Sequence, residues 1–177
     1  MTTIQTEQTE RTEQLQWFCG QIESNRLSLY RLAKSLLRQE EDAQDAVQDA
    51  IVSAYEKLGS LRSREKFRPW IMRILANACY DILRTRRDTA GLDDAEAIPA
   101  PVSRELGELL CLREAIDRLP ADYRAVIVLF YYEGLSIREI SHTLRITQGA
   151  VKTRLNRARE KLRHAIFDRE DGNGQPG

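Results

Sequence analysis

The sequence predicts an all-α protein with two small helical domains joined by a flexible acidic linker, the second domain containing a helix-turn-helix. Apolar residues recur at intervals of three and four residues over most of the 177-residue chain, which is the spacing of an amphipathic helix. No stretch alternates apolar and polar residues as a half-buried strand does. A segment with Gly91, Pro99 and Pro101 interrupts the helical pattern and divides the chain in two.

Composition narrows the possible classes of function. Hydrophobic residues make up 42% of the chain and charged residues 31%, with 27 basic and 27 acidic side chains. A net charge of zero argues against a nucleic-acid-binding protein, unless the charges are segregated along the chain. The three cysteines lack the spacing of metal ligands, so we expect small core residues with reduced thiols. The longest apolar run, 126–132, is too short to span a bilayer, and we expect a cytoplasmic protein without a cofactor.

The first domain is predicted over residues 22–87 as a bundle of three helices. The apolar stripes of these helices lie at 29–37, 43–58 and 70–83. Gly59 follows the second stripe as a plausible C-terminal cap. Residues 1–21 repeat Thr, Gln and Glu with little apolar content, so we expect a disordered N-terminal tail.

The linker is predicted over residues 88–104, where the helical pattern stops. Six carboxylates and one arginine lie between positions 88 and 108, which makes this segment strongly acidic. Helical spacing returns in the second domain, predicted over residues 105–167. Residues 168–177 end in three glycines and a proline, and we expect a second disordered tail there.

The second domain carries the strongest functional pattern. Ser136 and Glu139 form a capping box before a short helix, and a turn at 145–147 leads into a long basic helix. Val151, Leu155, Ala158 and Leu162 share the inward face of that helix. Its outward face then presents Lys152, Thr153, Asn156 and Arg157. Nine basic and three acidic residues between 136 and 169 favour binding in the major groove of DNA over an ordinary solvated face.

The third helix of the first domain is a second candidate DNA-binding element. Residues 61–87 hold eight basic and two acidic side chains. Arg73, Asn77, Tyr80 and Arg84 share one face outside the apolar stripe. Cations, an amide and an aromatic ring on one face suit single-stranded DNA, whose backbone is anionic and whose unpaired bases stack. Phe67 and Trp70 are more simply explained as core residues.

The second helix has the opposite charge. Residues 39–60 contain six carboxylates, among them Asp42, Asp45 and Asp49, and a single lysine. A catalytic or metal-binding role is disfavoured, because no histidine lies nearby and these acids fall on the outer face. The remaining interpretations are a solvated face and a surface for a basic protein partner. We find no enzyme active site in the sequence, neither catalytic residues nor metal ligands.

Both predicted domains resemble parts of a known protein family. Residues 42–58 (DAQDAVQDAIVSAYEKL) and 67–77 (FRPWIMRILAN) resemble region two of the extracytoplasmic-function sigma factors of bacterial RNA polymerase. Residues 119–129 (LPADYRAVIVL), 134–140 (GLSIREI) and 149–162 (GAVKTRLNRAREKL) resemble region four. The resemblance covers roughly 22–87 and 105–167, in the order of the family.

The resemblance implies a role for each surface. Region two of the family binds core RNA polymerase through its acidic helix, which assigns that role to Asp42, Asp45 and Asp49. Its loop and third helix melt the −10 element, which here implies the loop 60–66 with Asn77 and Tyr80; Arg73 and Arg84 join this set because they share the same helical face. Region four reads the −35 element of promoter DNA, which implies Lys152, Thr153, Asn156 and Arg157. An anti-sigma factor is a further expected partner.

Two positions depart from the family pattern. Arg145 stands in the turn where the family often has Gly or Asn, residues that tolerate a positive φ. Ser141 stands where the first helix of the motif often has Ala.

Two other readings of the sequence compete with the sigma factor. A stand-alone helix-turn-helix regulator would use 22–87 for dimerisation or ligand sensing, which the basic stripe of the third helix fits poorly. A helical enzyme or carboxylate-metal protein would need the Glu-x-x-His pairs that the chain lacks.

Overall fold

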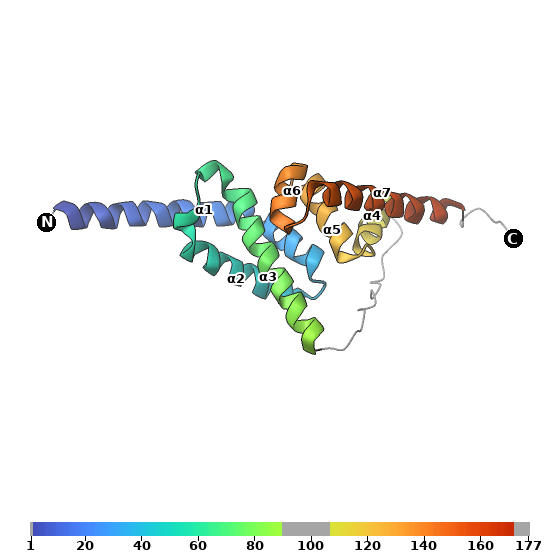
Figure 1. Cartoon of the computed structure of the whole chain (residues 1–177), viewed down its shortest axis with the longest axis horizontal. Coiled ribbons are helices and arrows are strands. Elements are labelled where there is room, and N and C mark those ends of the chain that lie inside the picture. The colour runs from blue at the N-terminus through green and yellow to red at the C-terminus, as the bar shows by residue number, and fades with distance from the viewer. Residues whose placement is uncertain (1, 90–106, 172–177) are drawn as a thin grey trace.

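A computed structural model of the chain describes residues 2–89 and 107–171. All regular elements in these two stretches are helices, which confirms the predicted all-α class. The first stretch contains α1 (Thr2–Leu36), α2 (Glu40–Glu56), the short 3₁₀ helices η1 (Leu58–Ser60) and η2 (Arg64–Lys66), and α3 (Phe67–Thr89). The second contains α4 (Gly107–Asp117), α5 (Ala121–Ile127), the π-helix η4 (Val128–Tyr132), α6 (Ile137–Leu144) and α7 (Gln148–Asp171) (Figure 1).

Small residues let the helices of the first domain pack closely. The inward face of α2 consists of alanines that are essentially inaccessible to solvent, namely Ala43, Ala46, Ala50 and Ala54. Larger side chains of α1 and α3, such as Leu32 and Ile71, fill the space between the three helices. Because an alanine face allows neighbouring backbones to approach, α2 lies along both α1 and α3.

The N-terminal segment differs from the prediction of a disordered tail over 1–21. Helix α1 begins at Thr2, and Phe18 is buried with only 4% of its surface exposed. The Trp17 ring packs edge-on against Phe67, with 5.4 Å between the ring centroids. The prediction is therefore wrong at these two aromatic residues, because their burial against α3 is a long-range contact that a polar local composition conceals.

The other predicted boundaries fall at helix ends or outside the described residues. Helix α3 continues to Thr89, so the predicted linker 88–104 starts inside it, and the rest of that linker lies outside the described residues. Helix α7 continues to Asp171, into the predicted tail 168–177, of which 172–177 are likewise not described. The helix-forming periodicity thus extends a few residues beyond the apolar pattern at both places.

The helix-turn-helix forms as the sequence predicts. The Ser136 hydroxyl accepts a hydrogen bond from the Glu139 backbone N–H at 3.2 Å, and the Glu139 carboxylate accepts one from the Ser136 N–H at 2.8 Å. This reciprocal capping box fixes the start of α6. On α7, Val151 and Leu155 are buried against the rest of the domain, which turns the opposite face of the helix outward.

The two domains pack against each other. Helix α3 contacts α6, and α1 contacts α5 and η4. Their buried side chains form one continuous apolar cluster rather than two separate cores. In Figure 1, α1 and α7 extend from this shared body in opposite directions.

Two of the cysteines have described side chains, and they differ. Cys79 is fully buried in α3, and burial raises the pKa of its thiol to about 12. Cys19 is exposed on α1, so the prediction of a core residue is wrong there. Trp17 and Phe18 beside it take the inward positions of that helical turn.

Arg145 has the left-handed backbone conformation that its position in the turn requires. Its φ is 54° and its ψ is 42°, and it is the one non-glycine residue with positive φ in the described stretches. The Ser141 hydroxyl donates a hydrogen bond to the Ile146 carbonyl at 2.7 Å, which ties α6 to the end of this turn. A side chain with a Cβ is strained in this region, typically by about 1 kcal/mol.

We therefore expect Arg145→Gly to raise the free energy of unfolding by about 1 kcal/mol, because glycine adopts the left-handed region without the Cβ clash. The measurement is the midpoint of urea unfolding followed by circular dichroism. Arg145→Ala is the control: it removes the same charge but keeps the Cβ, so its midpoint should not rise. Equal midpoints for the glycine and alanine variants would show that the backbone at this turn is unstrained.

Candidate nucleic-acid interface

The outward face of α7 presents the predicted DNA-binding residues. Lys152, Thr153, Asn156 and Arg157 are all exposed, while Val151 on the opposite side is fully buried. The N-terminal turns of such a helix are the part that meets base edges in a helix-turn-helix. Lysine and arginine match the acceptors of guanine, and asparagine pairs with adenine. The outward position of these four residues is as predicted, and their contact with DNA stays a prediction.

Arg159 contacts the polar face of α7 at one edge. Arg159 donates a hydrogen bond from Nε to the Tyr131 hydroxyl at 2.8 Å, and its guanidinium lies 5.6 Å from the centroid of that ring. Arg159 also reaches the Asn156 amide oxygen at 3.4 Å. Arg159 thereby connects the π-helix η4 to the polar face of α7, a link that sequence spacing alone does not reveal.

Arg154 of α7 points elsewhere. Its side chain is only 24% exposed and forms an ion pair with Asp122 at 2.9 Å. It also lies close enough to the Tyr80 phenol of α3 to lower the pKa of that group slightly. Burial raises the pKa of the Tyr80 phenol to about 12, and the nearby Asp122 carboxylate adds to that shift. A basic residue of the candidate reading helix is therefore engaged with the first domain.

The predicted exposed stripe of α3 is only partly exposed. Arg73 and Arg84 are open to solvent, and Arg84 pairs with Asp81 at 2.7 Å. Asn77 and Tyr80 are half-buried, so the prediction of one fully exposed face is wrong at these two positions. The physical reason is tertiary: the second domain packs along α3, and helical periodicity within the first domain cannot reveal it.

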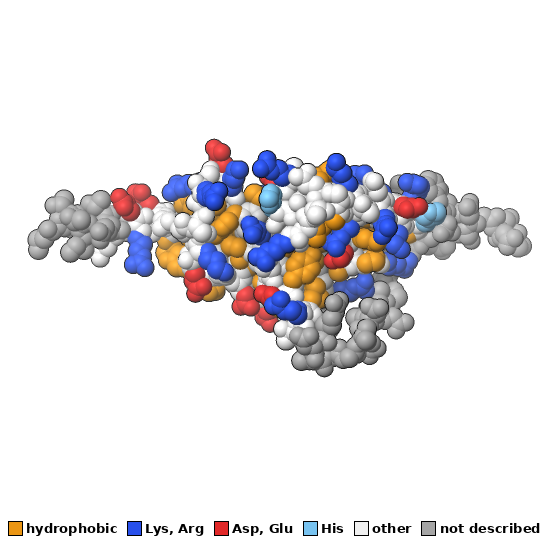
Figure 2. Space-filling model, in the orientation of Figure 1, with side chains coloured by type: hydrophobic (Ala, Val, Ile, Leu, Met, Phe, Trp, Pro, Cys, Tyr) orange, Lys and Arg blue, Asp and Glu red, His pale blue; other side chains and the backbone are white. Residues whose placement is uncertain are grey.

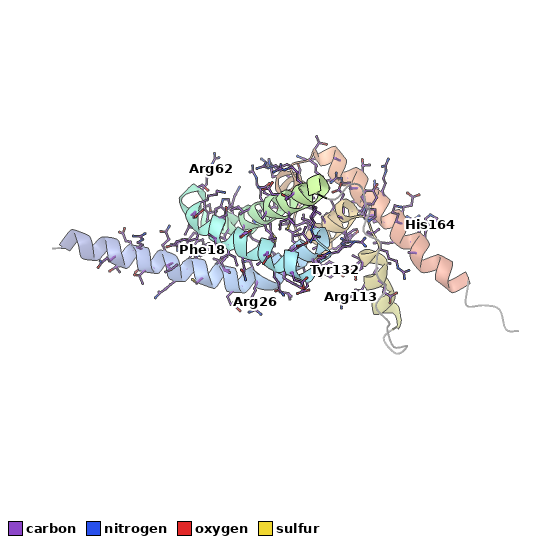
Figure 3. All side chains as sticks on the ribbon, turned by 90° about the horizontal axis from the view of Figure 1, so that it is seen from below. Phe18, Arg26, Arg62, Arg113, Tyr132 and His164 are labelled. Atoms are coloured by element: carbon purple, nitrogen blue, oxygen red, sulfur yellow. The ribbon has the colours of Figure 1, made fainter. Side chains whose placement is uncertain are left out.

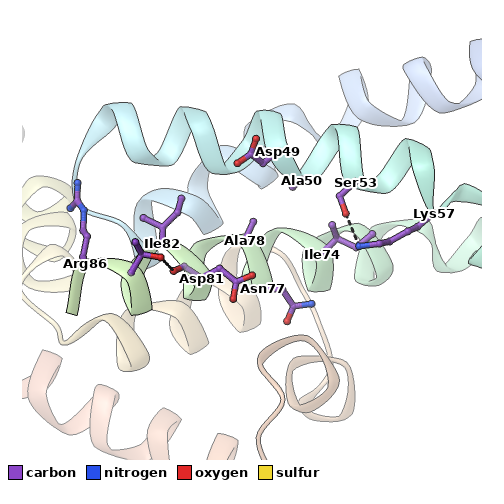
Figure 4. Close-up of a pocket in the computed structure, with 11 residues that line it drawn as sticks. Asp49, Ala50, Ser53, Lys57, Ile74, Asn77, Ala78, Asp81, Ile82 and Arg86 are labelled. Atoms are coloured by element: carbon purple, nitrogen blue, oxygen red, sulfur yellow. Dashed lines mark hydrogen bonds between the residues drawn. The ribbon is translucent and has the colours of Figure 1, made fainter. Parts of the chain in front are cut away.

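Asn77 opens onto a groove between α2 and α3 (Figure 4). This groove has a volume of about 500 Å³ and a floor of small apolar side chains such as Ala50 and Ala78. Its rim is polar, with Asp49 on α2 and Asp81 on α3. One predicted −10 residue and one predicted polymerase-binding residue thus line the same groove.

The three acidic residues predicted for polymerase binding are not equivalent. Asp45 and Asp49 are exposed on α2, as the helical pattern predicts. Asp42 is only 19% exposed and pairs with Arg86 of α3. That ion pair ties the start of α2 to the end of α3, so Asp42 contributes to the bundle itself as well as to its acidic surface.

The loop between α2 and α3 places basic residues close to both domains. The Arg64 guanidinium lies over the Trp17 ring, 4.8 Å from its centroid. Lys66 is close enough to Glu139 of α6 to help lower the pKa of that carboxyl, after the hydrogen bonds from the Ser136 hydroxyl and backbone. Phe67, at the start of α3, is buried as predicted.

Charge is segregated on the surface despite the net charge of zero. On the face seen in Figure 2, basic side chains spread over α3 and α7, and a smaller acidic group lies over the α2 side. Among the described residues no cluster of three or more histidines, cysteines and carboxylates could hold a metal ion. In the same residues, no helix combines the length and the apolar character that a bilayer crossing requires.

Two models of known protein families match the chain, one in each domain. The family model of sigma-70 region 2 matches residues 21–89, and the model of sigma-70 region 4 matches residues 109–162. The first match contains α2, α3 and the whole loop between them, and the second contains the helix-turn-helix.

Two similar proteins match the chain over most of its length. The ECF RNA polymerase sigma factor SigM of Mycobacterium tuberculosis is 38% identical over 136 residues, covering 76% of this chain and 69% of that protein. SigW of Bacillus subtilis, also an ECF RNA polymerase sigma factor, is 34% identical over 158 residues, covering 79% of this chain and 83% of that protein.

Two solved structures have a similar fold. One is the sigma factor RpoE in complex with the anti-sigma factor NepR from Bartonella quintana. It has a TM-score of 0.68 and 26% identity, and the match covers 85% of this chain and 96% of that one. The other is CnrH in complex with the cytosolic domain of CnrY, with a TM-score of 0.60, 30% identity, and coverage of 85% and 87%.

Proposed function

The chain belongs to the extracytoplasmic-function sigma factors of RNA polymerase, and we propose that the surfaces described above divide promoter recognition between its two domains. The single observation that carries this proposal is the ordered pair of sigma-70 regions, each with its candidate contact face on a defined helix. A stand-alone helix-turn-helix regulator accounts for the second match but leaves the first without a role.

We assign recognition of the −35 element to α7. Lys152, Asn156 and Arg157 lie outward on its first three turns, supported from below by Val151 and Leu155. A helix held in this way enters the major groove as a rigid unit, so its side chains meet base edges in a fixed register.

We assign melting of the −10 element to α3 and the loop before it. Arg73 and Arg84 supply positive charge for the backbone of a separated strand, and Asn77 supplies an amide at the mouth of the groove with α2. Tyr80, which is half-buried on the same helix, adds an aromatic ring to this set.

We assign binding of core RNA polymerase to the acidic face of α2. Asp45 and Asp49 are exposed there beside Tyr55 and Val52, two large side chains that are also solvent-accessible. Exposed apolar groups framed by charge are typical of protein–protein contacts. The chain would act in the cytoplasm with the polymerase, without a cofactor and without catalysis of its own.

An anti-sigma factor is a second proposed partner. The similar structure of RpoE holds the anti-sigma factor NepR, and the similar structure of CnrH holds the cytosolic domain of CnrY. A protein inhibitor of this chain would act by covering the polymerase-binding faces of the two domains.

The test of the proposed function is reconstitution. The purified chain is mixed with core RNA polymerase from its own host, and transcripts from a genomic promoter library are mapped. Transcription starting at a defined set of promoters, absent with core enzyme alone, is the expected result. Binding of duplex DNA as a dimer, with no change in polymerase activity, would instead identify a stand-alone regulator.

The first prediction from this assignment of surfaces concerns the −35 contact. Lys152→Ala and Arg157→Ala should each lower transcription from a cognate promoter roughly ten- to a hundredfold, since loss of a base contact costs about 1–3 kcal/mol. At least one of them should also change the −35 sequence preferred in a randomised library. Lys161→Ala is the matched control, because Lys161 is exposed on α7 beyond its base-reading turns. Unaltered preference and activity in both variants would remove α7 from the −35 assignment.

The second prediction concerns melting of the −10 element. Asn77→Ala should impair opening of the promoter by about 1–3 kcal/mol, because one base contact is lost, while polymerase binding stays intact. Permanganate reactivity of thymines in the −10 region measures the open complex. Gln14→Ala, which removes an exposed amide from α1, serves as control. Full thymine reactivity in the Asn77 variant would show that this amide does not contact the separated strand.

The third prediction concerns polymerase binding. The double reversal Asp45→Lys and Asp49→Lys should weaken binding to core enzyme about tenfold at low salt, and less at high salt, because charged contacts at the rim of an interface are screened. Glu10→Lys with Glu13→Lys makes the same charge change on exposed positions of α1. Equal affinities for the two double variants in a salt-controlled assay would contradict the assignment.

A further inference from the structure

We propose that Trp17 is a positioning residue for the −10 element: its ring holds Arg64 of the loop 60–66 and thereby fixes how that loop meets the promoter strand. The inference rests on the proposed function, because it deepens the −10 role assigned to that loop above. Trp17 precedes the segment that the sigma-70 region 2 model matches, which begins at residue 21. The match itself therefore gives this tryptophan no role.

The loop 60–66 is anchored at its two ends, and its cations are exposed. Leu58 before it and Phe67 after it are both buried. The exposed cations between these anchors are Arg62, Arg64 and Lys66. Positive side chains suit the backbone of a separated DNA strand. An exposed arginine samples many rotamers unless a neighbour holds it, so the direction of these charges depends on what the loop contacts.

Trp17 of α1 holds one of these cations. The central carbon of the Arg64 guanidinium lies 4.8 Å from the centroid of the Trp17 ring. At this distance the face of a tryptophan ring attracts a cation. Figure 3 shows the two elements at the same end of the first domain, with Arg62 labelled in the loop and Phe18 labelled on α1. The N-terminal part of α1 is thus in direct contact with the candidate −10 loop.

The Trp17 ring is itself fixed by other aromatic side chains. It packs against Phe67 with 5.4 Å between the ring centroids and an angle of 81° between the ring planes. Phe67 also contacts Phe18 and Trp70, with centroid distances of 6.0 and 5.8 Å. Phe67 is the first residue of α3, so these contacts tie the Trp17 ring to the helix that carries the other −10 residues. Arg64 therefore stacks on a ring that is held in place.

Carboxylates of α1 lie near the same arginine. Glu10 and Glu13 line a surface hollow of about 470 Å³ together with Arg64. Positions 10, 13 and 17 share one face of a helix, so these carboxylates and the Trp17 ring lie on the side of α1 that faces the loop. Exposed charges across a hollow attract each other weakly and are screened by salt. The ring contacts the guanidinium directly, and we therefore assign the positioning of Arg64 to Trp17.

The stack favours one arrangement of the loop over the others. An exposed cation–π pair shifts such an equilibrium roughly two- to fivefold. Without the ring, Arg64 and the loop backbone spend more time in other arrangements. Open complexes should then form less readily, and the −10 sequence should be read with less discrimination, because the contact surface is no longer preorganised.

The first measurement uses the full-length free chain without DNA. Hydrogen–deuterium exchange in the loop 60–66 should be roughly two- to fivefold faster in Trp17→Leu, which keeps apolar bulk but removes the ring. Trp17→Phe keeps an aromatic face and should exchange at nearly the wild-type rate. Leu27→Ala is the control, because it removes a side chain that is 64% exposed at a later turn of α1.

Circular dichroism verifies that each variant keeps its helical content. Arg64→Gln changes an exposed side chain and should accelerate exchange by the same factor, so it decides the outcome if Trp17→Leu does not fold. Wild-type exchange rates in the folded Trp17→Leu and Arg64→Gln variants would overturn the proposal.

The second measurement uses holoenzyme reconstituted with core RNA polymerase. Trp17→Leu should lower the yield of permanganate-reactive open complexes roughly two- to fivefold. It should also broaden the −10 sequence preferred in a randomised promoter library, while its affinity for core enzyme stays equal to wild type. Trp17→Phe should restore both the yield and the preference. A Trp17→Leu holoenzyme with wild-type yield and wild-type −10 preference would contradict the positioning role.

A double-variant cycle tests whether Trp17 acts through Arg64. Arg64→Gln removes the cation, so Trp17→Leu should have no further effect on open complexes in that background. A full additional effect would show that Trp17 only supports packing around Phe67, which would overturn the proposal. A wild-type chain that starts no transcription with core enzyme would count against the proposed function, and the exchange rates of the free chain would still decide whether Trp17 holds the loop.

Discussion

Helix α3 is packed on two sides, and the rest of the structure depends on that constraint. Its apolar stripe, with Ile71 and Leu75 at the centre, forms the core with α1 and α2. Helix α6 packs along another part of the same helix. Because a helix turns once in 3.6 residues, one segment offers separate stripes to separate neighbours. Helix α3 therefore packs against both domains. Its remaining polar stripe lies partly in solvent and partly in the interface with the second domain.

The packing of the two domains also changes which charges are exposed. Counting basic residues along α3 and α7 predicts two cationic surfaces, yet several of these arginines have partners within the chain. Arg68 is bound to Glu133 and Arg154 to Asp122, both across or beside the domain interface. The cations that remain exposed, such as Lys152 and Arg73, form a smaller and better-defined set. Segregation of charge in space, rather than the number of basic residues, is what makes a protein with no net charge suitable for DNA.

Local signals and distant contacts account for different parts of the structure. The capping box at Ser136 and the left-handed residue at Arg145 depend on neighbours within a few positions, so a short stretch of sequence suffices to predict them. The burial of Phe18 depends on Phe67, almost fifty positions away. A polar N-terminal composition predicts disorder there, whereas the aromatic contacts stabilise a helix. This difference explains why the helix-turn-helix was correctly predicted and the N-terminal tail was not.

The sequence by itself determined the helical class, the pairing of two sigma-70 regions and the outward face of α7, because each follows from periodicity or from motifs contained in one segment. Only the tertiary structure decided that Asn77 and Tyr80 are half-buried and that Asp42 is paired with Arg86. It also decided that Glu133, in a turn of ordinary polar appearance, lies buried between two arginines of the other domain. The physical reason is that a helical pattern specifies which side of a helix avoids water but not which neighbour covers its polar side. That choice depends on contacts between residues up to about a hundred positions apart, such as Arg31 and Glu133.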